Sequence, residues 1–410
     1  MGQKSENLEH KRTLSRGEFC ALTAYMMSLV ALAIDIMLPV LDEIGAELGT
    51  TAPNQPQLII AFLFGGLMVG QLIYGPASDT TGRKPAIFSG LAIFVIGCII
   101  SATAESFEAM LAGRFIQGLG VAGPRIVSIA IVRDLYAGRA MARITSIIMA
   151  FFILVPAIAP QLGQWIIMFA PWRMIFYVMI VLAGIIAIWY GIRQPESLPR
   201  EARRKFSARK LWDGAKEVFM TRVSLWYTVA AGIIYGAFLS YLFTSPQIFE
   251  DQFGIVDRFP VYFGALALVL GAAGFVNSKL VMNVGMRKLC RLALTAQAVA
   301  SFVALCIAFM GAGSIALPVF LAWGVMAFFT MGLLFGNFNA IAMEPLGHIA
   351  GIGSAFVSFI STGISLVIGQ SLGWAYNETV YPLLAGFFCL AVISIVVMRL
   401  ADRKLEAEII

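Results

Sequence analysis

Long stretches without a charged residue constrain the fold of this chain most strongly. Only 13% of its 410 residues are charged, and its mean hydropathy is +0.85. A helix needs about 20 apolar residues to cross the roughly 30 Å hydrocarbon layer of a bilayer. Charge-free runs that meet or nearly meet this length occupy residues 48–78, 85–104, 144–172, 174–192, 223–249, 259–278, 292–343, 345–377 and 379–398. These runs predict a membrane protein.

The number of spans follows from these runs and from two further segments. The run at 292–343 is long enough for two helices, and Gly311-Ala312-Gly313-Ser314 is a natural turn in its middle. The segments 19–41 and 109–132 are also apolar but contain charged residues. Because the runs are continuously apolar rather than alternating, they favour helices over a β-barrel. The sequence therefore predicts an all-α polytopic membrane protein with twelve transmembrane helices.

The basic residues predict how the chain is oriented. With the N-terminus inside, most of the 29 Lys and Arg residues fall on the cytoplasmic side, whereas the outer loops are mainly acidic. Both termini are then cytoplasmic. The net charge of +6 reflects this asymmetry near anionic lipid, so no nucleic-acid partner is expected.

One long hydrophilic segment divides the apolar chain into two halves of six spans. A weak repeat links the halves, because 82–84 (Gly-Arg-Lys) follows the second span and 285–288 (Gly-Met-Arg-Lys) follows the eighth. Repeated six-span halves occur in transporters that hold their substrate between the halves. The basic residues of the linker are expected to anchor a surface helix. We expect two pseudo-symmetric bundles and these segments: a tail at 1–18, a bundle at 19–193, the linker at 194–221, a bundle at 222–400 and a tail at 401–410.

Asp35 is the only carboxylate placed deep within an apolar stretch. An ionisable side chain in a bilayer costs at least about 2.5–3.5 kcal/mol, which makes it a functional-site candidate, most often for a proton or cation. Counting along the helices places Asp35 and Arg114 at a similar depth, about 10 Å from the outer surface. Burial of the two charges costs less if they pair or share a hydrogen-bond network. Two interpretations are open: a static pair, or a switchable site in which low dielectric favours protonation and the guanidinium opposes it.

The loop after the second span reads GPASDTTGRKP. It resembles the G-x-x-x-D-R-x-G-R-[RK] signature of the major facilitator superfamily, in which this loop lies at the cytoplasmic gate. Thr80 stands where the signature usually has Arg. A role in orientation and folding alone is the alternative. The matching positions are Gly75, Asp79, Gly82, Arg83 and Lys84.

The fourth span contains a second match, because Arg114, Gln117 and the glycines that follow resemble the R-x-x-Q-G-x-G signature of the same family. The resemblance links Arg114 to proton coupling, with Asp35 as the partner acid. Arg125 departs from the family pattern and lies three turns further along nearly the same face. It has two interpretations: it binds an anionic group of the substrate, or it is structural.

The fifth span contains a variant of the G-P-x-x-G-G motif, which marks exporters in this superfamily. Pro160 and Gly163 match the pattern, whereas Ala159 and Gln164 replace two glycines. Pro156, four residues before Pro160, is a second proline of this motif region. Prolines bend a helix, and small residues let a neighbouring helix pack closely. An ordinary kinked helix is the alternative.

Three stretches, 35–39, 130–136 and 337–347, narrow the resemblance to the bicyclomycin/chloramphenicol resistance (Bcr/CflA) branch of the drug:proton antiporters. This resemblance implies a monomeric bacterial inner-membrane protein that exports small hydrophobic or amphipathic drugs in exchange for protons, by alternating access and without a cofactor. A lipophilic ligand requires an apolar, aromatic cavity with a few polar groups. The residues expected there are Gln117, Arg125, Tyr235, Phe238, Tyr241, Asn337 and Asn339, with plain packing as the alternative for the aromatic ones.

Other functions fit the sequence less well. Within transporters, the alternative is proton-coupled movement of a metabolite such as a sugar, amino acid or organic acid. A membrane enzyme needs clustered catalytic groups, yet the chain has two histidines and no H-E-x-x-H, nucleophile elbow or P-loop. A receptor or channel explains neither the gate signature nor the two halves. We therefore expect a transporter rather than an enzyme, with no bound metal.

Overall fold

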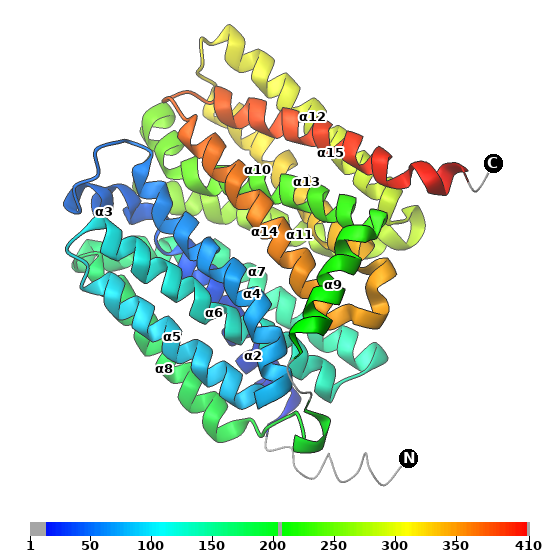
Figure 1. Ribbon diagram of the computed structural model, residues 1–410. Coiled ribbons are helices and arrows are strands. Elements are labelled where there is room, and N and C mark those ends of the chain that lie inside the picture. The colour runs from blue at the N-terminus through cyan, green and yellow to red at the C-terminus, as the bar shows by residue number, and fades with distance from the viewer. Residues whose placement is uncertain (1–13, 204–206, 408–410) are drawn as a thin grey trace. The chain divides into compact units, whose positions relative to one another are not determined.

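The computed structural model describes residues 14–203 and 207–407, and this part of the chain is helical without any strand. Figure 1 shows long helices throughout. Most of the expected N-terminal tail (1–18) and the end of the expected C-terminal tail (401–410) lie outside the described residues. The expectation of an all-α protein is confirmed.

The long helices of the first half of the chain follow one another with short connections. They are α2 (Arg16–Asp35), α4 (Leu58–Thr81), α5 (Arg83–Ala102), α6 (Phe107–Leu135), α7 (Gly138–Phe169) and α8 (Arg173–Arg193). Between α2 and α4 the chain forms η1 (Leu38–Val40), α3 (Leu41–Glu47) and η2 (Gln55–Gln57). Ser15 and Ser106 cap α2 and α6 by accepting hydrogen bonds from backbone N–H groups of the first turn.

The second half repeats this order after a linker that holds η3 (Arg200–Ala202) and α9 (Ala208–Met220). Its helices are α10 (Arg222–Phe253), α11 (Phe259–Val284), α12 (Met286–Met310), α13 (Leu317–Met343), α14 (Ala350–Trp374) and α15 (Tyr381–Ala407), with η4 (Glu344–Ile349) between α13 and α14. Within the described residues, 11 helical stretches are long and apolar enough to cross a membrane, and one of them, Leu317–Trp374, contains both α13 and α14. The prediction of twelve spanning helices is therefore confirmed.

Glycines with positive φ end matching helices in the two halves. Gly82 has φ +107° between α4 and α5, and Gly285 has φ +82° between α11 and α12. This backbone region is strained for residues with a Cβ atom. The expected turn at 311–314 is present as well, because α12 ends at Met310 and Gly313 has φ +98°.

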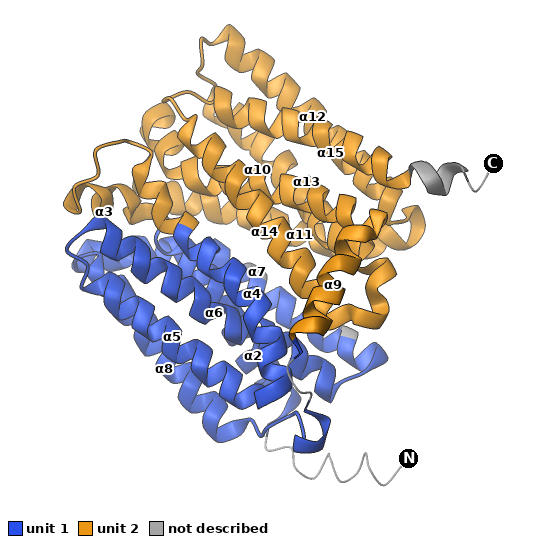
Figure 2. Ribbon diagram, viewed as in Figure 1, with its two compact units in different colours: residues 1–37, 62–207 blue, residues 38–61, 208–410 orange. Residues whose placement is uncertain are grey.

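The chain forms two compact units (Figure 2). Unit 1 contains residues 1–37 and 62–207, and unit 2 contains residues 38–61 and 208–410. Residues 38–61 therefore pack with the second half of the chain. The domain boundaries expected at 19–193 and 222–400 stay a prediction.

The same helix pairing recurs inside each unit. In unit 1, α2 contacts α6, α7 and α8, and α5 contacts α6 and α8. In unit 2, α10 contacts α13, α14 and α15, and α12 contacts α13 and α15. Each unit thus builds its core around its first helix. Large apolar side chains on the outside, such as Val181, Ile188 and Val367, suit helices that face lipid.

Candidate functional site

The polar centre of unit 1 begins at the end of α2. Nearly every residue of this helix from Phe19 onward is buried, and Asp35 is its last residue, with 5% of its surface exposed. Pro39 restricts the backbone that follows, so the chain turns into η1 instead of continuing the helix. The carboxyl group is thus held where the helix ends, inside the apolar core.

Arg114 and Gln117 lie one turn apart on α6, and both are completely buried. The Arg114 guanidinium donates to Gln117 Oε1 and to the backbone carbonyl oxygen of Ala33, the latter at 2.8 Å. Gln117 Nε2 lies 3.0 Å from Cys98 Sγ. Arg114 therefore reaches the backbone of α2 two residues before Asp35.

Glycines explain how α6 becomes buried deeply enough to hold this arginine. A Cβ atom at Gly118 would lie 1.9 Å from the carbonyl oxygen of Leu63 on α4. A Cβ atom at Gly120 would lie 2.2 Å from the backbone nitrogen of Phe94 on α5. Only glycine allows such close approach. The two glycines of the R-x-x-Q-G-x-G signature thus bring α4 and α5 against the helix that carries Arg114.

Asp35 and Arg114 are not joined directly. Among the residues that the structure describes, no ion pair links the Asp35 carboxyl to a basic side chain. The contacts found for the Arg114 guanidinium include neutral oxygen atoms of Gln117 and Ala33. The two charged groups therefore belong to one polar region through the α2 backbone rather than through a salt bridge.

Gly163 of the proline- and glycine-containing motif in α7 packs against the turn that follows Asp35. Pro156, Pro160 and Gly163 all lie within the continuous helix α7. A Cβ atom at Gly163 would lie 2.1 Å from the carbonyl oxygen of Ile36. Gly163 thus lets α7 touch the backbone next to Asp35, a contact that sequence reasoning did not anticipate.

The loop signature between α4 and α5 builds an ionic cluster around Arg83. The Arg83 side chain is 6% exposed and lies 2.6 Å from Asp79 and 2.8 Å from Asp134 at the end of α6. It also donates to Ser78 Oγ at 2.8 Å. One guanidinium therefore ties α4, α5 and α6 together. Asp79 belongs to the same loop signature as Arg83, whereas the sequence gave no sign that Asp134 is the second partner.

The linker after α8 contributes to the same cluster. The Glu196 carboxylate accepts hydrogen bonds from the backbone N–H groups of Arg83 at 2.9 Å and Lys84 at 3.0 Å, and so caps α5. Lys84 Nζ donates to the carbonyl oxygen of Gly191 at 2.9 Å. Lys84 therefore binds α8 instead of a carboxylate. A Cβ atom at Gly75 would meet nothing within 4 Å among the described residues.

The aromatic residues expected in the cavity gather in unit 2. Tyr235 and Phe238 on α10 both pack edge-on against Phe335 of α13, with ring centroids 4.4 and 5.7 Å away. Phe328, also on α13, lies 5.8 Å from Phe238 and 4.9 Å from Tyr241. Tyr235 and Phe238 are partly exposed, whereas Tyr241 is buried. The first two residues thus keep part of their surface exposed, whereas Tyr241 belongs to the core.

The remaining polar residues expected in the cavity differ in burial and do not form one group. Asn337 is buried and donates to Asn277 Oδ1 at 2.7 Å, which links α13 to α11. Asn339, two residues further on the same helix, is exposed. In unit 1, Arg125 is partly buried. Within the residues described, no cluster of His, Cys, Asp and Glu is arranged to hold a metal ion.

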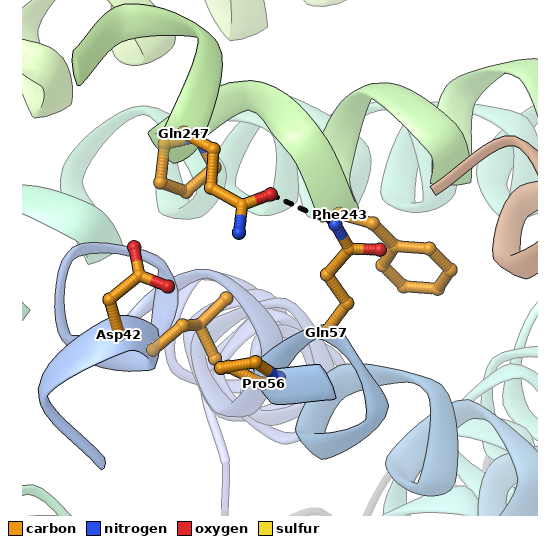
Figure 3. Close-up of a pocket in the computed structure, with 7 residues that line it drawn as sticks. Asp42, Pro56, Gln57, Phe243 and Gln247 are labelled. Atoms are coloured by element: carbon orange, nitrogen blue, oxygen red, sulfur yellow. Dashed lines mark hydrogen bonds between the residues drawn. The ribbon is translucent and has the colours of Figure 1, made fainter. Parts of the chain in front are cut away.

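A small polar pocket lies where residues 38–61 pack on α10 (Figure 3). Gln57 Nε2 donates to Gln247 Oε1 at 3.0 Å, and Gln247 donates to the carbonyl oxygen of Pro53 at 2.8 Å. Asp42 and Phe243 also line the pocket. Its empty volume, which includes space open to solvent, is ≈ 180 Å³. These contacts therefore hold residues 38–61 against α10 within unit 2.

The C-terminal end of α14 makes similar contacts with residues 38–61. Asn54 Nδ2 donates to the carbonyl oxygens of Trp374 at 3.2 Å and Tyr376 at 3.0 Å. The Tyr376 hydroxyl donates to Asp251 at 2.7 Å. Burial and this carboxylate raise the pKa of Tyr376 above its usual range. The hydroxyl therefore stays protonated as a donor at any ordinary pH.

Comparison with known proteins matches the chain to the family model described as Major Facilitator Superfamily over residues 19–370. The chain is 26% identical over 393 residues to a protein of Haemophilus influenzae named bicyclomycin resistance protein homolog, covering 94% of this chain and 97% of that one. It is 28% identical over 369 residues to the multidrug resistance protein MdtL of Shigella dysenteriae, covering 90% and 89%. These names confirm the resemblance to the drug-resistance branch as a distant relationship.

The fold has solved counterparts. The xylose transporter XylE of Escherichia coli, in a partially occluded inward-open conformation, matches with a TM-score of 0.72 at 12% identity, covering 93% of this chain and 96% of that one. At this identity the likeness concerns the fold alone.

Proposed function

The chain belongs to the major facilitator superfamily, and we propose that it exports small hydrophobic or amphipathic drugs in exchange for protons. Proteins of this family are multi-pass membrane transporters of small molecules rather than enzymes. The proposal adds the driving ion, the direction of transport and the class of substrate.

The observation that carries the proposal is the buried carboxyl group of Asp35. It lies within a spanning helix, has no ion-pair partner among the described residues and is 5% exposed. A lone buried carboxylate is costly in its charged form, so a proton neutralises it wherever water does not reach it. Exposure of the same group to water lets the proton leave. A group whose charge depends on access is suited to coupling proton movement to alternating access.

Three features support export of lipophilic molecules. The names of the distant relatives refer to bicyclomycin and multidrug resistance. Pro160 and Gly163 of the exporter motif lie in α7, and Gly163 packs beside the turn after Asp35. The partly exposed rings of Tyr235 and Phe238 offer an apolar contact surface. We propose that the buried amides of Gln117 and Asn337 add polar contacts to the substrate. Asn339 and Arg125, which are more exposed, are the further polar residues proposed for the substrate site.

The remaining expectations concern location and gating. We place both termini in the cytoplasm, because most basic residues then lie inside. The resemblance to the drug-resistance branch adds that the protein is a monomer in the inner membrane of a bacterium. The Arg83 cluster, with Asp79, Asp134 and Glu196, then lies on the cytoplasmic side. Its charged contacts are suited to a gate that opens and closes during transport.

Proton flux in inverted membrane vesicles tests the proposal. An acid interior is generated, and a panel of lipophilic drugs, sugars, amino acids and organic acids is added in turn while a pH-sensitive dye is followed. Drugs are expected to release protons from vesicles that contain the protein and not from vesicles without it. Proton release by metabolites alone would point to metabolite transport. Drug movement that continues after a protonophore removes the gradient would rule out proton coupling.

A further inference from the structure

The short helix α9 directly precedes a helix that is long and apolar enough to span a membrane. It ends at Met220, and the spanning helix α10 begins at Arg222, so one residue separates them. Figure 1 shows α9 beside one end of α14. A helix joined so closely to the start of a span cannot lie far from the headgroup layer, which extends the bilayer from about 30 to about 40–45 Å.

One face of α9 is fixed to unit 2. A Cβ atom at Gly214 would lie 2.5 Å from Ile352 Cγ2 of α14, and Val218, one turn later, is buried. Glu217 lies 2.8 Å from His348 Nε2 in η4. The orientation of α9 about its own axis is therefore set by these contacts, and the side chains on its other faces have defined directions.

The next face carries two exposed aromatic side chains. Trp212 is 72% exposed and Phe219 is 53% exposed. They are seven residues apart, so at about 100° per residue they lie within about 20° of each other around the helix. Lys216 and Arg209 are exposed and follow within about 40° and 60° of Trp212 on the same side. Asp213 is exposed beyond them.

This order of faces is that of a helix lying in a lipid–water interface. Trp and Phe favour the boundary between headgroups and acyl chains, and flanking Lys and Arg extend toward lipid phosphates. Acidic side chains then face water. We infer that α9 is an interfacial helix whose Trp212 and Phe219 insert into the leaflet and whose Arg209 and Lys216 bind the phosphates of anionic phospholipids.

The bilayer is favoured over a protein partner for two reasons. The aromatic pair belongs to a helix that is covalently continuous with a membrane span. The basic pair complements the negative charge of anionic lipid. Bound in this way, α9 holds the linker and the start of α10 at a fixed depth in the membrane. This role is independent of the substrate and of the driving ion.

Hydrogen exchange of residues 208–220 in full-length protein tests the inference. The protein is placed in nanodiscs of phosphatidylcholine alone or mixed with phosphatidylglycerol. Exchange is expected to be slower with phosphatidylglycerol. R209Q/K216Q should lower that lipid dependence by up to ~30-fold, since each basic residue near an anionic surface contributes about 1 kcal/mol. W212A/F219A should speed exchange in both lipids, whereas W374A, which removes another exposed tryptophan, should not.

A measurement that relies on the wild type and one conservative variant guards against variants that undock α9. Fluorescence quenching by doxyl-labelled lipid and by aqueous iodide is compared between the wild type and W212F, and the difference reports Trp212. Quenching by lipid supports the inference. Quenching by iodide alone, or exchange that is identical in the two lipids, would overturn it and leave this face to water or to a protein partner.

Discussion

The centres of the two units differ in charge. In unit 1, Asp35 and Arg114 are buried within spanning helices. In unit 2, Asp402 is the buried charged residue among those described, and it lies at the end of a span, beside Arg291 at 3.1 Å. The interior of unit 2 uses neutral pairs instead, such as Asn337 with Asn277. The same helix arrangement therefore carries a titratable centre in one half and an aromatic, neutral centre in the other.

The ionic clusters around Arg83 in unit 1 and Arg287 in unit 2 have similar contacts but differ in burial. Arg83 and Arg287 both follow a glycine with positive φ. Arg83 binds Asp134 just inside the end of α6, and Arg287 binds Glu344 just past the end of α13, each at 2.8 Å. The Arg83 side chain is 6% exposed and that of Arg287 is 31% exposed. Related clusters thus have different surroundings, and the more buried one depends more on its partners.

The largest effect is expected from Asp35→Asn. Asn has the shape of a protonated carboxyl group but cannot release a proton, so proton-driven transport should be abolished while substrate binding survives. The measurement is drug uptake into liposomes driven by a pH gradient, with drug binding measured separately. Asn337→Ala in unit 2 is the matched variant and should change substrate preference but keep coupling. Normal pH-driven transport by Asp35→Asn would remove the distinction between the two centres.

Arg83→Gln should destabilise the protein more than Arg287→Gln. Loss of Arg83 leaves the carboxylate of Asp134 without its ion-pair partner, although Ser197 still donates to it. Because the Asp134 side chain is 18% exposed, the cost should lie between the about 0–1 kcal/mol of exposed pairs and the about 3–5 kcal/mol of buried ones. Loss of Arg287 should cost about 0–1 kcal/mol, as for exposed pairs, since Arg291 and Tyr227 still hold Asp402. Thermal unfolding of both variants in detergent measures the difference. Equal melting temperatures would show that burial does not separate the clusters.

Gly163→Ala should be less well tolerated than Gly373→Ala. The new Cβ atom would meet the Ile36 backbone at 2.1 Å in unit 1, but the end of the Gln57 side chain at 2.2 Å in unit 2. A side chain can rotate, whereas the helix backbone must move, at a cost of about 1–3 kcal/mol. Gly184→Ala, which would meet nothing within 4 Å, is the control. Melting temperature and transport rate are both measured. Equal losses of these two quantities in Gly163→Ala and Gly373→Ala would contradict the idea that the backbone contact of Gly163 is the less adaptable one.

Arg114→Ala should move the pH optimum of transport upward by a modest amount. Removing a positive charge from the polar region makes ionised Asp35 less favourable, so its proton is released only at higher pH. Gln297→Ala, which breaks a neutral pair with Thr330 in unit 2, should leave the optimum unchanged. Arg114→Lys separates two roles for the arginine. If Arg114→Lys keeps the normal pH optimum, the positive charge of Arg114 sets the optimum. If Arg114→Lys shifts the pH optimum as much as Arg114→Ala does, the hydrogen bond from Arg114 to Ala33 is what matters.

Much of the architecture could be predicted from local sequence. Apolar runs gave the helices because a span of the bilayer requires a certain length, and Gly82 and Gly313 marked turns that need positive φ. Asp79 and Arg83, which pair at 2.6 Å, belong to the same short loop signature and so lie close together in the sequence. Asp134 and Glu196 could not be assigned in this way, since they reach Arg83 and its neighbour from distant parts of the chain.

The sequence by itself determined that this protein is a helical membrane protein and that Asp35 is a costly buried group, because both depend on hydrophobicity along one chain. The loop and span signatures, through their resemblance to a known family, indicated a transporter. Only the tertiary structure decided that Arg114 binds neutral oxygens, that Gly163 touches the turn after Asp35 and that residues 38–61 pack with unit 2. The physical reason is that these contacts depend on distances between backbones of different helices. Such distances are set by packing, and no pattern within a single helix contains them.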